Sequence, residues 1–189
     1  PEIEEFLDVR KPTGGDVNRK SVNLHHGVLI DDKFMDIIEQ ATRVEGFDDS
    51  WDLIDPHSKK IIKTVSAKTL WVKLIQNRVE TGEPYIMFKD TVQAALPQFQ
   101  KDLGLQVNHS NLCSEITLAT NANRTAVCCL SSVNLEEYDE WKDNPQFIND
   151  LVRMLDNVIT HFCDAAPAQL YRAVASAKAE RSIGLGAMG

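Results

Sequence analysis

The stretch Ser110-Asn111-Leu112-Cys113-Ser114-Glu115-Ile116 carries the side chains on which the interpretation of the whole chain depends. In an extended backbone, side chains two positions apart point to the same side. This alternation predicts Asn111, Cys113 and Glu115 on one side of the segment. An amide that donates and accepts hydrogen bonds, a carboxylate that takes a proton and a sulfur capable of nucleophilic or one-electron chemistry would then face one small molecule.

A second pair of thiols follows in Ala126-Val127-Cys128-Cys129-Leu130, after a polar turn over residues 120–124. Strand alternation places Cys128 on the face of Ala126 and Leu130, and turns Cys129 to the opposite face. Only one of these neighbouring thiols can therefore face a site. From the residues alone, a buried and chemically inert cysteine in a strand is the ordinary structural interpretation.

Composition restricts the class of protein. The chain has 189 residues, 43% hydrophobic and 25% charged, which is typical of a soluble domain with one core. A net charge of −8 argues against a nucleic-acid-binding surface. No apolar run is long enough to span a membrane, and no signal peptide opens the chain. Four cysteines without a Cys-x-x-Cys pair indicate a reducing, cytoplasmic compartment.

The periodicity of apolar residues predicts alternating helices and strands, which favours an α/β layer or barrel. Asp31 is expected to cap one helix and Gly82 to end another. The adjacent His25 and His26 are expected to pack or form hydrogen bonds, because neighbouring strand residues point to opposite faces and cannot easily share a metal ion. The expected helices are 2–9, 32–41, 67–81 and 146–163, the strands 21–30, 85–88 and 125–131, and the loops 10–20, 46–58 and 96–109.

Two of the quoted segments resemble the catalytic core of the large (α) subunit of class I ribonucleotide reductase. That family carries an Asn-Leu-Cys-x-Glu finger loop, here Asn111 to Glu115, and a cysteine strand that ends in Leu-Ser-Ser/Ala-x-Asn-Leu, here Cys128 to Leu135. Residues 2–11 and 84–90 resemble further family segments. The resemblance implies part of the ten-stranded α/β barrel of ribonucleotide reductase, with a central finger loop. Residues 1–189 are then a partial catalytic barrel domain, with the N-terminal ATP cone and the C-terminal half absent.

The resemblance also implies a role for each polar residue. Cys113 would be the thiyl radical that abstracts the 3′ hydrogen of a ribonucleotide, Glu115 the general base on the 3′ hydroxyl, and Asn111 the residue that holds the ribose hydroxyls. Cys128 would belong to the redox-active disulfide. Cys129 departs from the family pattern, which leaves open whether it exchanges roles with Cys128.

The loop over residues 10–20 aligns with a mobile family segment between the allosteric specificity site and the substrate base. The resemblance implies contacts from Asp16, Asn18 and Arg19, with Gly14 and Gly15 supplying mobility.

The resemblance implies no metal and no cofactor held by this chain. A metal-containing small subunit would supply the radical, and nucleotide effectors (ATP, dNTP) would regulate the enzyme. The implied partners are a ribonucleoside diphosphate substrate, the rest of the large subunit, the small radical-generating subunit and thioredoxin or glutaredoxin. The full large subunit is expected to be a homodimer. Neither nucleic acid nor a membrane is expected as a partner. The other redox cysteine lies upstream in the family, so we expect no turnover from this chain alone.

Two alternatives remain from the sequence. The first alternative to a catalytic reductase segment is a non-catalytic split-gene segment, which serves as a folding and interface piece that complements other reductase fragments. The second is an unrelated thiol or metal-binding α/β domain, whose cysteines would ligate zinc.

Overall fold

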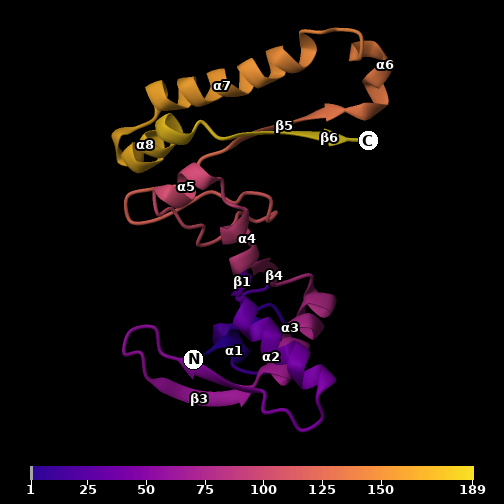
Figure 1. Ribbon diagram of the computed structural model, residues 1–189, viewed down its shortest axis with the longest axis vertical. Helices are drawn as coiled ribbons and strands as arrows, with labels where there is room; N and C mark the ends of the chain where they lie inside the picture. The colour runs from indigo at the N-terminus through magenta and orange to yellow at the C-terminus, as the bar shows by residue number, and fades with distance from the viewer. Residues whose placement is uncertain (1) are drawn as a thin grey trace. The chain divides into compact units, whose positions relative to one another are not determined.

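Two parallel pairs of strands, each connected through helices, organise the structure (Figure 1). The computed structural model describes residues 2–189. Its contacts divide the chain into a first unit, which runs to Pro97 and includes His109–Glu115, and a second unit of Gln98–Asn108 with Ile116–Gly189. Parallel strands cannot be joined by a tight turn, so each pair requires a crossover connection. This strand–helix–strand pattern confirms the predicted α/β class.

In the first unit, β1 pairs in parallel with β4, with Gly27 opposite Tyr85, while β2 and β3 form an antiparallel hairpin. The predicted strand over 21–30 is thus correct only for its last four residues. The predicted loop over 46–58 is wrong over its middle residues, which form β2 from Ser50 to Ile54. The elements of this unit are α1 (Ile3–Leu7), η1 (Val17–Arg19), β1 (Gly27–Ile30), α2 (Asp32–Arg43), β2 (Ser50–Ile54), β3 (Ile61–Ser66), α3 (Ala67–Thr81), β4 (Tyr85–Phe88) and α4 (Lys89–Ala95).

Local capping fixes the helix ends of the first unit. The Asp31 side chain accepts a hydrogen bond from the Phe34 amide at 2.9 Å, which confirms the predicted N-cap of α2. Helix α3 ends as predicted at Gly82, whose φ of 77° lies in the left-handed region that glycine adopts without a steric penalty.

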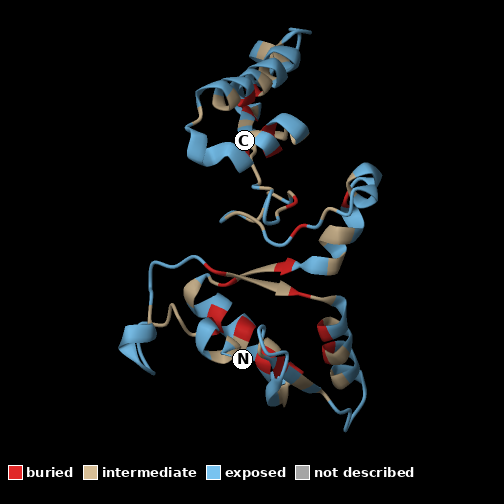
Figure 2. Ribbon diagram, turned by 90° about the vertical axis from the view of Figure 1, so that its left-hand side faces the viewer, coloured by how far each residue is buried: buried red, intermediate tan, exposed pale blue. Residues whose placement is uncertain are grey.

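The core of the first unit lies between the helices and the two small sheets (Figure 2). Leucine and isoleucine side chains spaced along α2 and α3 meet side chains from α1, β1 and β2. Burial of these apolar groups is the main stabilising contribution to the unit. The buried members are Leu7, Ile30, Phe34, Ile38, Leu53, Ala67, Leu70 and Leu74.

His26 lies in this unit as a buried residue with 4% of its surface exposed, edge-on to Phe6 at 4.8 Å between ring centroids. Burial lowers the pKa of His26 below its usual value of 6.5, against the opposing charge of Glu83. His25, by contrast, is exposed and lies 2.7 Å from Glu83 through its Nδ1 atom. The two histidines therefore pack and form hydrogen bonds separately, as predicted.

The buried imidazole predicts a loss of stability in mild acid. The unfolded chain protonates His26 below about pH 6.5 while the folded unit resists protonation, so the free energy of unfolding should fall as pH falls through this range. Urea unfolding of a Trp141→Phe variant, in which fluorescence reports Trp51 and Trp71 of the first unit, measures the effect. His26→Phe should flatten the pH dependence relative to the parent, and an unchanged slope would contradict the assignment.

In the second unit, β5 and β6 pair in parallel from Cys129 opposite Ile183 to Asn134 opposite Met188. Gly184 permits this pairing, since a Cβ atom there would lie 2.5 Å from Leu130 Cδ2. The sequence does not predict a strand in the apolar, glycine-rich segment that forms β6, and the predicted loop over 96–109 is wrong where α5 lies. The elements of this unit are α5 (Gln98–Asp102), β5 (Cys129–Asn134), η2 (Leu135–Glu137), α6 (Tyr138–Trp141), α7 (Phe147–Ala165), η3 (Ala168–Leu170), α8 (Tyr171–Glu180) and β6 (Ile183–Met188).

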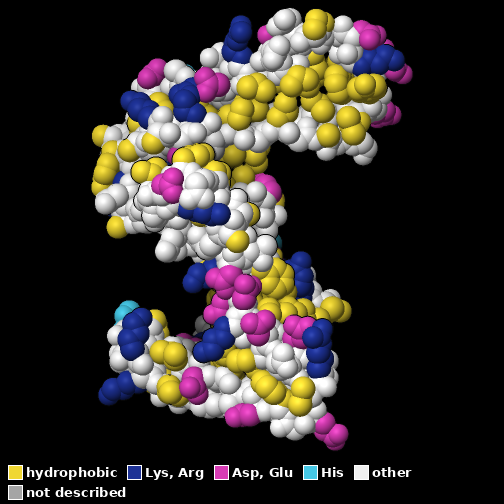
Figure 3. Space-filling model, viewed as in Figure 1, with side chains coloured by type: hydrophobic (Ala, Val, Ile, Leu, Met, Phe, Trp, Pro, Cys, Tyr) yellow, Lys and Arg dark blue, Asp and Glu magenta, His cyan; other side chains and the backbone are white. Residues whose placement is uncertain are grey.

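Helix α7 lies against β5, β6 and α8 through Leu155 and Ile159, both buried. Apolar residues nearer the start of this helix, Ile148 and Val152, are exposed instead. Figure 3 shows hydrophobic side chains along this helix at the surface.

The strands of residues 2–189 form three separate two-stranded sheets rather than a closed barrel. The expectation that the core of this chain encloses the Cys113 segment is therefore wrong for the described residues. No helix in this described range has both the length and the apolar character needed to cross a membrane.

Candidate functional site

The segment around Cys113 is a turn, not the predicted extended strand. The Ser114 amide donates to the Asn111 carbonyl at 3.1 Å, and Ser114 has a φ of +66°, in the left-handed region. The preceding residues support the turn: the Ser110 amide donates to His109 Nδ1 at 2.9 Å, and the Ser110 hydroxyl donates to Asn111 Oδ1 at 3.2 Å. The alternation argument that placed three side chains on one face therefore fails.

The turn nevertheless leaves its polar groups accessible. Cys113 and Glu115 are exposed, and Asn111 is half-buried. The structure places the amide, thiol and carboxylate within five consecutive residues at the surface of the first unit, instead of holding the thiol inward. Chemically, this surface turn offers an accessible thiol with a proton acceptor two residues away.

Cys113 lies in an open hollow of about 380 Å³ in the first unit. The aromatic wall of this hollow is Tyr85, at the start of β4, whose pKa is raised by burial and further by the charges of Glu83 and Cys113. The lining residues are Arg78, Gly82, Glu83, Tyr85, Ile86, Leu112, Cys113 and Ser114.

A glycine on β1 allows the aromatic wall to form. Tyr85 meets His109 edge-on, with ring centroids 6.0 Å apart. A Cβ atom on Gly27 would lie 2.6 Å from Tyr85 Cε2 and 2.8 Å from His109 Cε1, so a larger residue would displace both rings. Gly27 therefore lets the segment that leads into the Cys113 turn pack closely over the β1–β4 pair.

Cys128 lies in the second unit, immediately before β5, and both it and Cys129 are half-buried. The predicted strand over 125–131 is therefore wrong for its first four residues, so strand alternation does not orient Cys128. Polar contacts to α8 hold the chain segment that leads into these two cysteines. Arg124 forms an ion pair with Glu180, and the Thr125 amide donates to Ser176 Oγ at 3.1 Å. The predicted turn at 120–124 is confirmed by paired backbone hydrogen bonds between Asn121 and Arg124.

All of the predicted loop residues except Asn18 line a second hollow of the first unit, of about 440 Å³. Gly14 and Gly15 have φ values of +78° and +71°, which the bend of the loop requires. Asp16 accepts from the Asn18 amide at 2.9 Å, and Arg19 pairs with Glu5 at 2.8 Å. Asn18 is not among the lining residues, which are Glu4, Glu5, Asp8, Lys11, Thr13, Gly14, Gly15, Asp16, Arg19, Lys20 and Lys73.

Comparison with known proteins decides the family. The family described as "Ribonucleotide reductase, barrel domain" matches residues 1–189, the whole chain. The chain belongs to the ribonucleotide reductase barrel domain family. The match contradicts the alternative of an unrelated thiol or metal-binding domain, and it assigns the separate sheets of this chain to a barrel-forming family.

Viral and bacterial relatives agree with this membership in the ribonucleotide reductase family. The chain is 53% identical to a Frog virus 3 (isolate Goorha) protein assigned as a ribonucleoside-diphosphate reductase large subunit, and 43% identical to the large subunit of Invertebrate iridescent virus 3. Both similarities cover 100% of this chain, but 32% and 37% of the relatives. The chain thus spans about a third of the length of these curated relatives.

A solved structure shares the fold of this reductase barrel segment. The Actinobacillus ureae class Id ribonucleotide reductase alpha subunit matches with a TM-score of 0.76 and 33% sequence identity, covering 100% of this chain and 31% of that chain. The predicted fold class is therefore confirmed at the level of the family.

Sequence reasoning missed the residues that surround Cys113 in this structure. Glu83 and Tyr85 are distant from Cys113 in sequence and line its hollow, whereas His109 is close to Cys113 in sequence and meets Tyr85 edge-on. Tyr85 is weakly predictable, because it lies in the segment of residues 84–90 that resembles the family. Glu83 and His109 lie outside the segments that carry the resemblance.

Proposed function

We propose that this chain supplies the segment of a ribonucleoside-diphosphate reductase large subunit that carries the reacting thiol. The observation that supports it is the accessible Asn111, Cys113 and Glu115 turn within a chain that matches the reductase barrel domain over its full length. The proposed reaction is the radical-based reduction of ribonucleotides to deoxyribonucleotides.

In this proposal Cys113, as a thiyl radical, takes the 3′ hydrogen atom of the ribose and becomes a thiol. A thiol suits this step because its S–H bond is comparable in strength to the activated C–H bond, so the transfer is nearly balanced. Glu115 takes the proton of the 3′ hydroxyl as general base. Asn111 binds the ribose hydroxyls through its amide, which can donate and accept hydrogen bonds.

Cys128 supplies one of the two thiols that deliver electrons and become a disulfide, while Cys129 remains the alternative for that role. Its partner thiol comes from elsewhere in the assembled enzyme, as do the radical, from a metal-containing small subunit, and the reducing equivalents, from thioredoxin or glutaredoxin. We further propose that the assembled large subunit is a homodimer.

The loop of Gly14, Gly15, Asp16, Asn18 and Arg19 would respond to nucleotide effectors such as ATP and dNTPs. The basic side chains of its hollow are balanced by as many acidic ones, so an effector would have to displace ion pairs within the hollow to bind there; the basic residues are Lys11, Arg19, Lys20 and Lys73, and the acidic ones Glu4, Glu5, Asp8 and Asp16. Asp8 is one of these acids: burial raises its pKa, but the hydrogen bond and charge of Lys73, 2.7 Å away, together with the hydrogen bond from Asn77 and the charge of Lys11, bring it below its ordinary value.

The second candidate is a non-catalytic segment that complements other reductase fragments. Two features of the isolated chain favour this second candidate. Cys113 is exposed, and so are apolar residues of α7, so both require other chain segments to cover them. The neighbouring coding sequence discriminates the two: a reading frame that resumes the barrel supports complementation.

A chimera tests the proposal directly. The 189 residues replace the aligned segment of the Invertebrate iridescent virus 3 large subunit, and deoxynucleotide formation is assayed with nucleoside diphosphate, reductant and the small subunit of that virus. We expect turnover from the chimera and none from the chain alone. A folded, assembled chimera without turnover would favour the non-catalytic alternative, and deoxynucleotide from the isolated chain would contradict the requirement for other segments.

A further inference from the structure

We propose that Glu83 is a positioning residue that ties the neck of the Gly14–Gly15 loop to the wall of the Cys113 hollow. This inference rests on the proposed function for the meaning of the loop and of the thiol. It assigns to one carboxylate, outside the residues that would touch substrate, the task of coupling the two hollows of the first unit.

The two ends of the loop lie close together, and we call them its neck: Val9 and Arg10 before the loop, Ser21 and Leu24 after it. The Ser21 amide donates to the Val9 carbonyl at 2.8 Å, and Arg10 Nη1 donates to the Leu24 carbonyl at 3.0 Å. The residues between 11 and 20 thus leave and re-enter the unit at one place.

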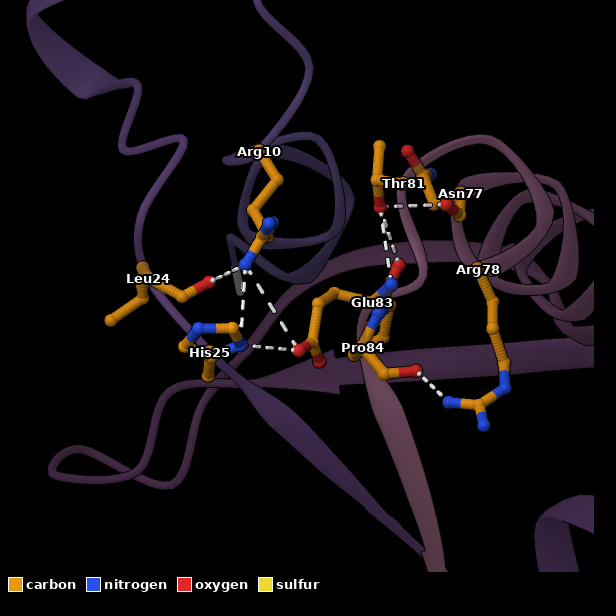
Figure 4. Close-up of polar contacts among 8 residues, drawn as sticks. All are labelled: Arg10, Leu24, His25, Asn77, Arg78, Thr81, Glu83 and Pro84. Atoms are coloured by element: carbon orange, nitrogen blue, oxygen red, sulfur yellow. Dashed lines mark hydrogen bonds and ion pairs between the residues drawn. The ribbon is translucent and has the colours of Figure 1, made fainter. Parts of the chain in front are cut away.

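The Glu83 carboxylate meets both sides of this neck (Figure 4). Its Oε1 atom lies 2.7 Å from His25 Nδ1, where the ring N–H donates to it, and 4.0 Å from Arg10 Nη1. The Glu83 side chain is 13% exposed and that of Arg10 19%, so the ion pair between them is less screened than the surface pairs of the loop, whereas the His25 side chain is 53% exposed. The Glu83 carboxylate is thus held by one short, partly exposed hydrogen bond and one longer, better shielded ion pair.

The backbone of Glu83 is held to the end of α3. Thr81 Oγ1 accepts from the Glu83 amide at 3.2 Å, and its one hydrogen is shared between the Asn77 carbonyl at 2.8 Å and the Glu83 carbonyl at 2.9 Å. Arg78 Nη1 donates to the Pro84 carbonyl at 2.8 Å. Figure 4 shows these contacts on one side of Glu83 and the loop neck on the other.

Glu83 also acts on the hollow that contains Cys113. It lines that hollow together with Tyr85, two residues further along the chain. Its negative charge contributes to the raised pKa of Tyr85, after burial and ahead of Cys113. A displacement of the loop neck that moved the carboxylate would therefore change the field at Tyr85 and Cys113.

The test uses the full 189-residue chain carrying Tyr138→Phe and Tyr171→Phe, which leaves Tyr85 as the one tyrosine. Glu83→Gln should raise the hydrogen-exchange rate of backbone amides in residues 11–24 about tenfold. It should also lower the titration midpoint of Tyr85, measured by ultraviolet absorbance, because a negative charge is removed. Loss of structure around Tyr85 would also lower its midpoint, because burial is the largest cause of its raised pKa, so the titration supports the proposal only where the exchange of the α3 and β4 amides is unchanged.

Glu80→Gln is the matched control. Glu80 pairs with Lys11 of the same loop at 2.9 Å, but its side chain is 57% exposed, so its loss should change neither readout. Unchanged exchange and an unchanged tyrosine titration in Glu83→Gln would overturn the proposal.

A second pair of variants decides the matter if Glu83→Gln raises exchange throughout α2 and α3 because it fails to fold. His25→Asn keeps an N–H donor near the position of Nδ1, whereas His25→Ala removes it. Faster exchange of residues 11–24 in His25→Ala alone supports the proposal, and equal exchange in both variants overturns it. Neither readout depends on turnover, so an inactive chimera would leave this inference standing.

Discussion

Cys113→Ser should abolish deoxynucleotide formation by the reductase chimera. Serine has a similar size and polarity, but its O–H bond is much stronger than the S–H bond, so the hydroxyl cannot readily be converted into the radical that would take the 3′ hydrogen. We expect a loss of at least about a thousandfold in turnover, the scale on which removal of a covalent or radical nucleophile acts. Because Cys113 is exposed in a turn, the substitution should leave the stability of the first unit unchanged.

Cys163→Ser provides the comparison in the same assay. Cys163 lies within α7, half-buried, with its sulfur 4.0 Å from the Val174 carbonyl of α8, and the proposal gives it no chemical role. This variant should retain turnover. If the two serine variants had similar activity, Cys113 would not be the reacting thiol.

Ile159→Ala should produce the largest loss of stability in the second unit. Ile159 is fully buried on the face of α7 that packs against β5 and β6, so truncation removes apolar contacts and leaves a cavity. Substitutions of this kind cost about 2–5 kcal/mol. Hydrogen exchange of the α7 and β5 amides measures the cost, and the α3 amides of the first unit serve as an internal reference.

Val158→Ala tests the burial argument at the adjacent position. Val158 is 48% exposed on the same helix, so its truncation should change exchange by a small fraction of the Ile159 effect. Equal effects at the two positions would mean that this face of α7 is not the one that packs on the sheet.

The helix ends and the long helices were predictable because their causes are local. Asp31 caps within three residues and Gly82 ends a helix by its own conformational freedom, so neither depends on the remainder of the chain. The β2–β3 hairpin escaped prediction because Leu53 is its one buried residue in β2 and every residue of β3 is at least partly exposed, which gives no strong apolar alternation. The strand β6 was not predictable because its two glycines are typical of a loop. Gly184 is required here for a non-local reason, since the Leu130 side chain occupies the space where a Cβ atom would lie.

The candidate site was predictable in its residue types but not in its geometry. Asn111, Cys113 and Glu115 drew attention by their chemistry, yet the left-handed conformation of Ser114 has no signal in a serine side chain. The contact of Glu83 with His25 joins residues 58 positions apart, and no periodicity predicts a pairing at that separation.

The closed neck of the Gly14–Gly15 loop has a consequence for how this segment can diverge. Since the Val9–Ser21 and Arg10–Leu24 contacts fix both ends, insertions and deletions at the tip change only the closure entropy of a short segment. Doubling such a segment costs about 0.6 kcal/mol. Over evolutionary time the tip of the loop can therefore change in length and in the ligands it binds, while the stability of the first unit that carries it changes little.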